Sequence, residues 1–202
     1  MRSQCIGQGF ESPYLHFLKI IFESFEFRVE NLELRIEDLN PWFILRVPAG
    51  SVFVFAMPAG ENHKAWLNNL LSQILTQETV QINTDSFGKP HLPEGMGFVN
   101  WSTSKGECVL AYSKEYDVGI DLEFYRNRNF EAISKRFFAS SEASTKAETF
   151  YLLWTKKEAY YKCLGGSFFA TLKSDSYPNA KIWNLQGPYK EKHELALCLK
   201  IK

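Results

Sequence analysis

The segment "YDVGIDLEFYRNR", Tyr116 to Arg128, places two acidic residues inside an apolar strand pattern. Three apolar residues alternate with three others: Val118, Ile120 and Leu122 with Gly119, Asp121 and Glu123. This alternation predicts a β-strand, because successive strand side chains point to opposite faces. Asp121 and Glu123 then share one face, roughly 6.5–7 Å apart along the chain. Like charges that close destabilise a fold, so we expect a positive group beside them.

A long helix is predicted further along, in "AETFYLLWTKKEAYYKCLGG", residues 147–166, where Gly165 and Gly166 supply the stop. Glu158 and Lys162 are four residues apart and therefore neighbours on this helix. If the helix packs against the acidic strand, three carboxylates converge, and such a set suits Mg²⁺, which prefers oxygen ligands and shares its shell with phosphates. The alternative is an exposed acidic strand end and a surface Glu158–Lys162 pair.

The rest of the chain mixes strands and helices. Strands are expected over residues 26–56, a helix over 62–77 and a Gly/Pro-rich loop over 87–97. The segment "FVNWSTSKG" resembles a strand end running into a polar loop, and "ECVLAYS" forms a hairpin with "VGIDLEF" through Lys114–Asp117. A short helix over 129–138 and two closing strands complete the pattern. One main helix in each portion favours an α+β fold with a duplicated unit.

Composition indicates an ordinary globular protein. The chain has 202 residues, of which 45% are hydrophobic and 15% aromatic. No apolar run reaches the ~18 residues that a membrane span needs, and the start lacks the apolar core of a signal peptide. The four cysteines (Cys5, Cys108, Cys163 and Cys198) lack CxxC spacing. Free buried thiols and a cytoplasmic location are therefore expected.

Charge is unevenly distributed although the net charge is zero. Residues 124–202 hold fourteen basic and seven acidic groups, a net charge of +7. This excess favours a polyanionic ligand or an acidic partner, with a solvated lysine-rich surface as the alternative. No RNP, helix-turn-helix or zinc pattern supports a nucleic-acid partner.

Three segments in order carry a family resemblance: "VGIDLE", "KRFFASSE" and "FYLLWTKKEAYYKCLGG". They resemble the 4'-phosphopantetheinyl transferase signature of (V/I)G(I/V)D(I/L)E, RFF and W(S/T)xKEAxxK. The resemblance covers roughly Asn62 to Lys202. With the upstream "FGKPHLP…FVNWSTS", the chain is similar to the larger, monomeric pseudo-dimer class, the surfactin-synthetase-activating type. This implies two similar α+β halves, residues 1–106 and 107–202, related by a pseudo-twofold, each with a small antiparallel sheet packed on a main helix.

The implied activity is a Mg²⁺-dependent group transfer. Such enzymes move the 4'-phosphopantetheine arm of coenzyme A to a serine of an acyl or peptidyl carrier protein and release 3',5'-ADP. The alternative is a weak homologue that binds coenzyme A or a carrier protein without turnover.

The resemblance assigns roles to individual residues. Asp121, Glu123 and Glu158 match the metal carboxylates, and Glu158 also matches the proposed general base. Lys162 matches a lysine that contacts the coenzyme A phosphates, so the catalytic set is Glu158, Lys162 and Asp121. The residues that match coenzyme-binding positions are Lys64, Gly88, Lys89, Pro90, Ser102, Thr103 and Lys162.

Two departures from the family pattern stand out. The family's "N(I/V)SHS" loop reads "NWSTS" here, with Thr103 in the place of the histidine, so binding of the 3'-phosphate is expected to be weaker. The first ~60 residues lack the usual arginine-rich helix and are acidic.

The partner expected is an acidic carrier protein. The segment Phe124–Phe138 interleaves basic residues with phenylalanines and directly follows the acidic strand. We therefore expect the carrier to dock there, with no membrane or nucleic-acid partner.

Overall fold

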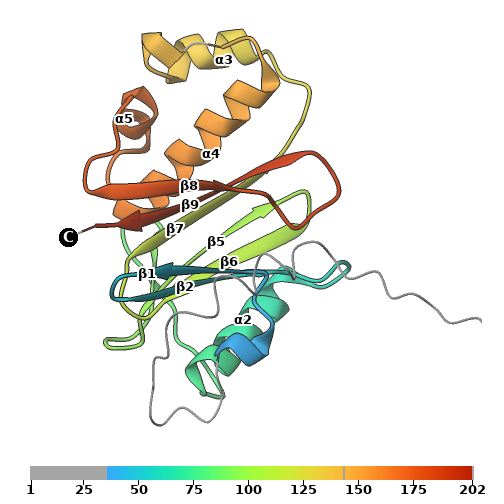
Figure 1. The fold of residues 1–202 in the computed structure, drawn as a ribbon, viewed down its shortest axis with the longest axis vertical. Helices are drawn as coiled ribbons and strands as arrows, with labels where there is room; N and C mark the ends of the chain where they lie inside the picture. Colours follow the sequence, from blue (N-terminus) through green and yellow to red (C-terminus); the bar gives the residue numbers. More distant parts are fainter. Residues whose placement is uncertain (1–35, 143, 202) are drawn as a thin grey trace, which may run out of the picture. The chain divides into compact units, whose positions relative to one another are not determined.

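The computed structural model describes residues 36–142 and 144–201. The strands expected over 26–35, Cys5 and most of the acidic N-terminal region lie outside the described residues. The described part has two main antiparallel sheets with helices, so the predicted α+β class is confirmed (Figure 1).

The first sheet has four strands in the order β1-β2-β6-β5. Their bounds are β1 Phe43–Val47, β2 Gly50–Ala56, β6 Glu107–Ser113 and β5 Phe98–Ser104. The expected helix is α2, His63–Leu75. It packs on the outer face of this sheet and buries Leu67, Leu70, Leu71 and Ile74. The Asn62 side chain caps it by accepting hydrogen bonds from two backbone N–H groups of the first turn.

The second sheet has three strands in the order β7-β9-β8. Their bounds are β7 Val118–Phe124, β9 His193–Lys200 and β8 Ala180–Leu185. The predicted long helix is α4, Ala147–Leu164, which packs on β7 and β9 and ends at Gly165. The approach is close at Gly119, where an added Cβ would lie 2.1 Å from the Ala159 carbonyl oxygen. Only glycine therefore fits at this point of the acidic strand.

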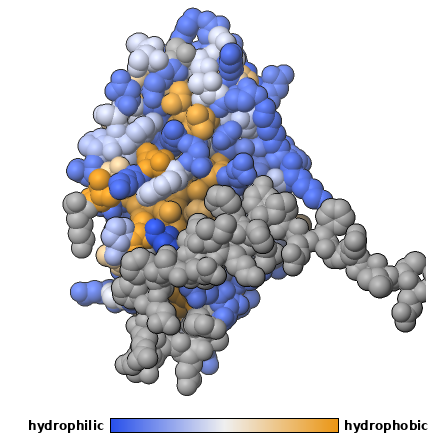
Figure 2. Space-filling model, viewed as in Figure 1, coloured by the Kyte–Doolittle hydropathy of each residue, from blue (hydrophilic) through white to orange (hydrophobic). Residues whose placement is uncertain are grey.

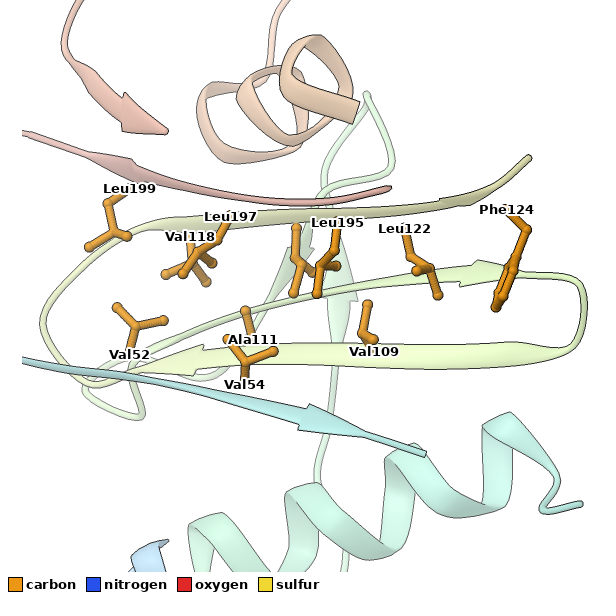
Figure 3. Close-up of a cluster of buried hydrophobic side chains, with 11 residues drawn as sticks. Val52, Val54, Val109, Ala111, Val118, Leu122, Phe124, Leu195, Leu197 and Leu199 are labelled. Carbon is orange, nitrogen blue, oxygen red and sulfur yellow. The ribbon is translucent and has the colours of Figure 1, made fainter. Parts of the chain in front are cut away.

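The two sheets share an apolar core. Side chains of β2 and β6 point toward those of β7 and β9, as Figure 3 shows for ten labelled residues. They are Val52, Val54, Val109, Ala111, Val118, Leu122, Phe124, Leu195, Leu197 and Leu199. Burial of this many branched side chains fixes the packing of one sheet on the other.

The predicted hairpin between "ECVLAYS" and "VGIDLEF" is wrong. β6 pairs with β2 and β5, whereas β7 pairs with β9, so the chain changes sheet between residues 113 and 118. Nearly all of β6 is buried, which suits a central strand with both faces covered.

The segment predicted as a strand end and polar loop is instead the full strand β5. Lys105 and Gly106, both with positive φ, turn it into β6 as in a tight hairpin. The expected division after residue 106 falls in this turn.

Smaller elements complete the described residues. They are η1 Ile36–Leu39, β3 Asn83–Thr84, β4 Pro90–His91, α3 Phe130–Phe137, η2 Ser140–Glu142 and α5 Phe168–Lys173. Of these, α3 was predicted, η1 stands where a strand was expected, and α5 was not foreseen.

Apolar residues at the surface form separate patches over β8, β9 and the helical layer, with polar residues around them (Figure 2). Within 36–142 and 144–201, no helix combines the length and the apolar character needed to cross a bilayer.

Candidate active site

The centre of the candidate site is the buried carboxylate of Asp121 on β7. Its Oδ1 accepts hydrogen bonds from Lys162 Nζ at 2.7 Å and from Ser102 Oγ at 2.9 Å. Lys162 Nζ also donates to Ser102 Oγ at 3.1 Å and to the Ile120 carbonyl at 3.2 Å. The positive group expected beside the acidic strand is therefore, in this structure, the Lys162 ammonium from α4.

A row of polar side chains on β5 lines the edge of β7. Asn100 Oδ1 accepts from the backbone N–H of Ile120 at 3.2 Å, and Ser104 Oγ accepts from that of Phe124 at 3.4 Å. Ser102 lies between Asn100 and Ser104, since alternate strand residues share a face. Sequence reasoning missed Asn100 and Ser104, although the N-x-S-x-S spacing of "NWSTS" carried the signal.

The other two acidic residues are electrostatic neighbours of Asp121. Burial raises the pKa of Glu158 to about 8, and the Asp121 charge adds to this rise. Burial and the Asp121 charge also raise the pKa of Glu123, while Arg128 and Arg126 oppose that rise. The Asp121 charge therefore disfavours ionisation of both Glu123 and Glu158.

The described residues include no group of three His, Cys, Asp or Glu side chains arranged to hold a metal ion. Convergence of Asp121, Glu123 and Glu158 on one ion therefore stays a prediction.

The residues nevertheless fit a hard cation. Asp121 Oδ2 is buried with no hydrogen-bond partner among the described residues, and the Glu158 carboxyl is held largely protonated by burial at neutral pH. A bound cation would give this oxygen a partner and would reduce the repulsion between the acidic side chains. Carboxylate oxygens are also the ligand type that Mg²⁺ prefers. Asp121, Glu123 and Glu158 are the side chains that would hold it.

A cleft of about 210 Å³ is lined in part by Lys162, the hydrogen-bond partner of Asp121. It brings together most of the predicted coenzyme-binding loop and Lys162 with three aromatic side chains. The lining residues are Phe87, Gly88, Lys89, Pro90, Asn100, Trp101, Tyr161, Lys162 and Gly165. Such a mixture of aromatic walls and a cationic side chain suits a nucleotide-like ligand.

Lys89 anchors the cleft loop. Its Nζ forms an ion pair with Asp117 at 2.6 Å and donates to the Cys163 carbonyl at the end of α4. The Lys89 side chain is 10% exposed. Asp85 Oδ1 shapes the turn by accepting from the backbone N–H groups of Phe87 and Lys89. This arrangement gives Lys89 a positioning role.

Three predicted coenzyme-binding residues, Lys64, Ser102 and Thr103, are not in the cleft lining. Lys64 is exposed in the first turn of α2. Thr103 is exposed on β5, on the side opposite the buried Ser102. The structure therefore joins Ser102 with Asp121 and Lys162, and leaves Thr103 and Lys64 outside this cluster.

Comparison with known proteins identifies the family. Residues 117–196, which contain β7 and α4, match the model of the 4'-phosphopantetheinyl transferase superfamily. The chain is 30% identical over 153 residues to the 4'-phosphopantetheinyl transferase AcpT of Escherichia coli (strain K12), covering 70% of this chain and 77% of that protein. The chain belongs to the 4'-phosphopantetheinyl transferase superfamily.

Other members of the superfamily are also similar to this transferase. It is 34% identical over 115 residues to HetI of Nostoc sp., covering 49% of this chain and 48% of that protein. It is 29% identical over 111 residues to Sfp of Bacillus subtilis (strain 168), covering 50% of this chain and 49% of that protein. The superfamily motifs of this transferase thus coincide with β7 and α4, the elements that carry Asp121, Glu158 and Lys162.

Proposed function

We propose that this transferase moves the 4'-phosphopantetheine arm of coenzyme A to a serine hydroxyl of a carrier protein, with Mg²⁺, and releases 3',5'-ADP. One observation carries the proposal beyond the family match. The Asp121–Lys162–Ser102 cluster lies at the edge of a cleft that is lined by the Gly88–Pro90 loop and by Lys162 itself.

The reaction forms one bond and breaks one. The serine oxygen bonds to the phosphorus that bears the pantetheine arm, and the phosphoanhydride bond to 3',5'-ADP breaks. The serine proton leaves to a base, and a carboxyl with a pKa of about 8, such as Glu158, accepts a proton readily once it is ionised. When bound, Mg²⁺ supplies neutralisation of phosphate charge.

Protein side chains perform the remaining work. Lys162 contributes positive charge at the cleft, and Ser102 orients Asp121 through its 2.9 Å hydrogen bond. Phe87, Trp101 and Tyr161 offer ring surfaces to the flat adenine base. Lys89 keeps its loop at the end of α4.

Carrier docking is proposed on α3 and α5. In the expected segment, Phe124 and Phe138 are buried, 2% and 1% exposed, so they belong to the core. Phe169 of α5 is 67% exposed, the most exposed large hydrophobic side chain among the described residues, and it stacks on Phe137 of α3. Arg136 lies over the same Phe137 ring. An exposed ring beside basic side chains suits an acidic helical partner.

The finer organisation is also proposed. One main helix on the outer face of each sheet supports two α+β halves related by a pseudo-twofold. Three free, buried cysteines, Cys108, Cys163 and Cys198, support a reducing, cytoplasmic location. A monomer agrees with the family class that the sequence resembles.

The decisive experiment is intact-mass measurement of apo-carrier proteins after incubation with the transferase, coenzyme A and Mg²⁺. Gain of one phosphopantetheine is expected, and Glu158→Gln should suppress it. Binding of coenzyme A with no mass gain on any apo-carrier would overturn transfer and leave a binding protein without turnover.

A further inference from the structure

We propose that Lys162 and a divalent cation compete for Asp121, so that the cation binds well only after coenzyme phosphates have drawn Lys162 away. This inference rests on the proposed function, because it assumes that coenzyme A occupies the cleft. It makes Lys162 the residue that couples the two binding events.

The hydrogen-bond donors of Lys162 are all in use. An ammonium has three N–H donors, and Lys162 Nζ has three acceptors within 3.2 Å: Asp121 Oδ1, Ser102 Oγ and the Ile120 carbonyl. No donor is left for a phosphate. A phosphate in the cleft must therefore replace at least one of these contacts.

The Lys162 ammonium lies where a cation on Asp121 would be its near neighbour. Lys162 Nζ lies 2.7 Å from Asp121 Oδ1, and the Asp121 side chain is 3% exposed. A divalent cation bound to this carboxylate would have a like charge as its near neighbour in a poorly solvated site. Repulsion is strong there because little water screens it. Lys162 in its present place therefore weakens cation binding.

The Lys162 side chain can also reach into the cleft. Its side chain is 22% exposed and lines the cleft, so the flexible four-carbon stem reaches both Asp121 and the cleft. An anion there attracts the ammonium and leaves Asp121, whose Oδ2 already lacks a partner among the described residues, to the cation. Linkage is reciprocal, so the cation must strengthen coenzyme binding by the same factor.

The test measures Mn²⁺ binding to the full chain by electron paramagnetic resonance, with and without coenzyme A and without any carrier protein. In wild type, coenzyme A should tighten Mn²⁺ binding at least tenfold. In Lys162→Met, Mn²⁺ should bind at least tenfold more tightly than to wild type in the absence of coenzyme, and coenzyme should tighten this binding by a smaller factor than in wild type. Lys181→Met, which removes one positive charge from an exposed position on β8, is the control and should behave as wild type.

Three outcomes separate the possibilities. Equal or weaker Mn²⁺ binding by a folded Lys162→Met protein, checked by circular dichroism, overturns the competition. If this variant does not fold, calorimetry of wild type decides, since coenzyme affinity that is independent of Mn²⁺ also overturns it. If adding Asp121→Asn to Lys162→Met leaves Mn²⁺ binding intact, the cation does not use Asp121, which overturns the competition and the Asp121 metal site of the proposed function together.

Discussion

Lys89, just before β4, and Asp117, just before β7, form an ion pair with a nitrogen–oxygen distance of 2.6 Å, although they are 28 positions apart in the sequence. This pair ties the cleft loop to the acidic strand. Lys89→Met should destabilise the protein by roughly 1–3 kcal/mol, less than for a fully buried pair, because Asp117 and the Cys163 carbonyl lose their partner. Urea unfolding measures the change. Combining it with Asp117→Asn should cost less than the sum of the two single losses, and strictly additive losses would refute the pairing.

Gly119→Ala should move α4 away from β7. The new methyl group would lie 2.1 Å from the Ala159 carbonyl oxygen and 2.5 Å from the Cys163 nitrogen, both backbone atoms that cannot turn aside. A loss of about 1–3 kcal/mol or more is expected, with loss of transfer, because Glu158 and Lys162 move with the helix. Thermal unfolding and a transfer assay test this. Unchanged melting temperature would contradict the close approach.

Stability should fall with rising pH through Glu158. The pKa of this carboxyl in the folded protein is about 8, above its ordinary 4.5, so the folded state binds more protons between these values. The favourable contribution is complete below about pH 4.5 and is lost as the pH rises through 8. Urea midpoints in EDTA at pH 5 to 9 should decline in wild type and decline less in Glu158→Gln. Parallel curves for the two proteins would argue against the shift.

Thr103→His tests whether β5 holds the 3'-phosphate of coenzyme A. The position is exposed, so the fold should tolerate the change. A charge-assisted hydrogen bond is worth ~1.5–3 kcal/mol at best, and coenzyme A should bind more tightly. Calorimetry with coenzyme A and its 3'-dephospho form measures this, with Thr103→Gln as an uncharged control. No preference for coenzyme A in either the wild-type or the Thr103→His protein would remove this strand position from the phosphate site.

Phe169→Ser should weaken binding of the carrier protein and leave coenzyme A binding unchanged. Phe169 is 67% exposed and its ring contacts are with Phe137 and Phe168, so its loss should affect the fold little. The KM for the carrier should rise severalfold while that for coenzyme A is unchanged. Phe98→Ser, at a 38% exposed phenylalanine on β5, is the matched control. An equal effect of both variants would mean that α5 is not the docking surface.

The local elements of this fold were predictable wherever one face is buried. The Gly119, Asp121 and Glu123 alternation predicted β7, and the spacing from Ala147 to Leu164 predicted α4 with its glycine stop. The pairing of strands was less accessible. β6 and β7 follow one another through a short link, yet they join different sheets, because strand pairing depends on partners far along the chain.

The site was predictable in its residues and not in its contacts. The spacing of Asp121 places it on one face of a strand, and the spacing of Glu158 and Lys162 makes them neighbours on a helix. Spacing does not determine which acidic side chain pairs with which lysine. The structure shows Lys162 bound to Asp121 itself, and Lys89 to Asp117. The β5 row of Asn100, Ser102 and Ser104 was overlooked because a polar segment resembles a loop until its alternation is matched to a neighbouring strand.

The contact between β5 and β7 is made by side-chain hydrogen bonds of β5 and not by a ladder of backbone hydrogen bonds. A ladder repeats at every residue pair, whereas this contact depends on a few specific donors and acceptors at Asn100, Ser102 and Ser104. All three side chains are buried and polar, and none belongs to the apolar clusters of the two sheets. Evolution can therefore retune or silence the chemistry of Asp121 by exchanging small polar residues on a strand that carries no catalytic group, while the molecule keeps its fold.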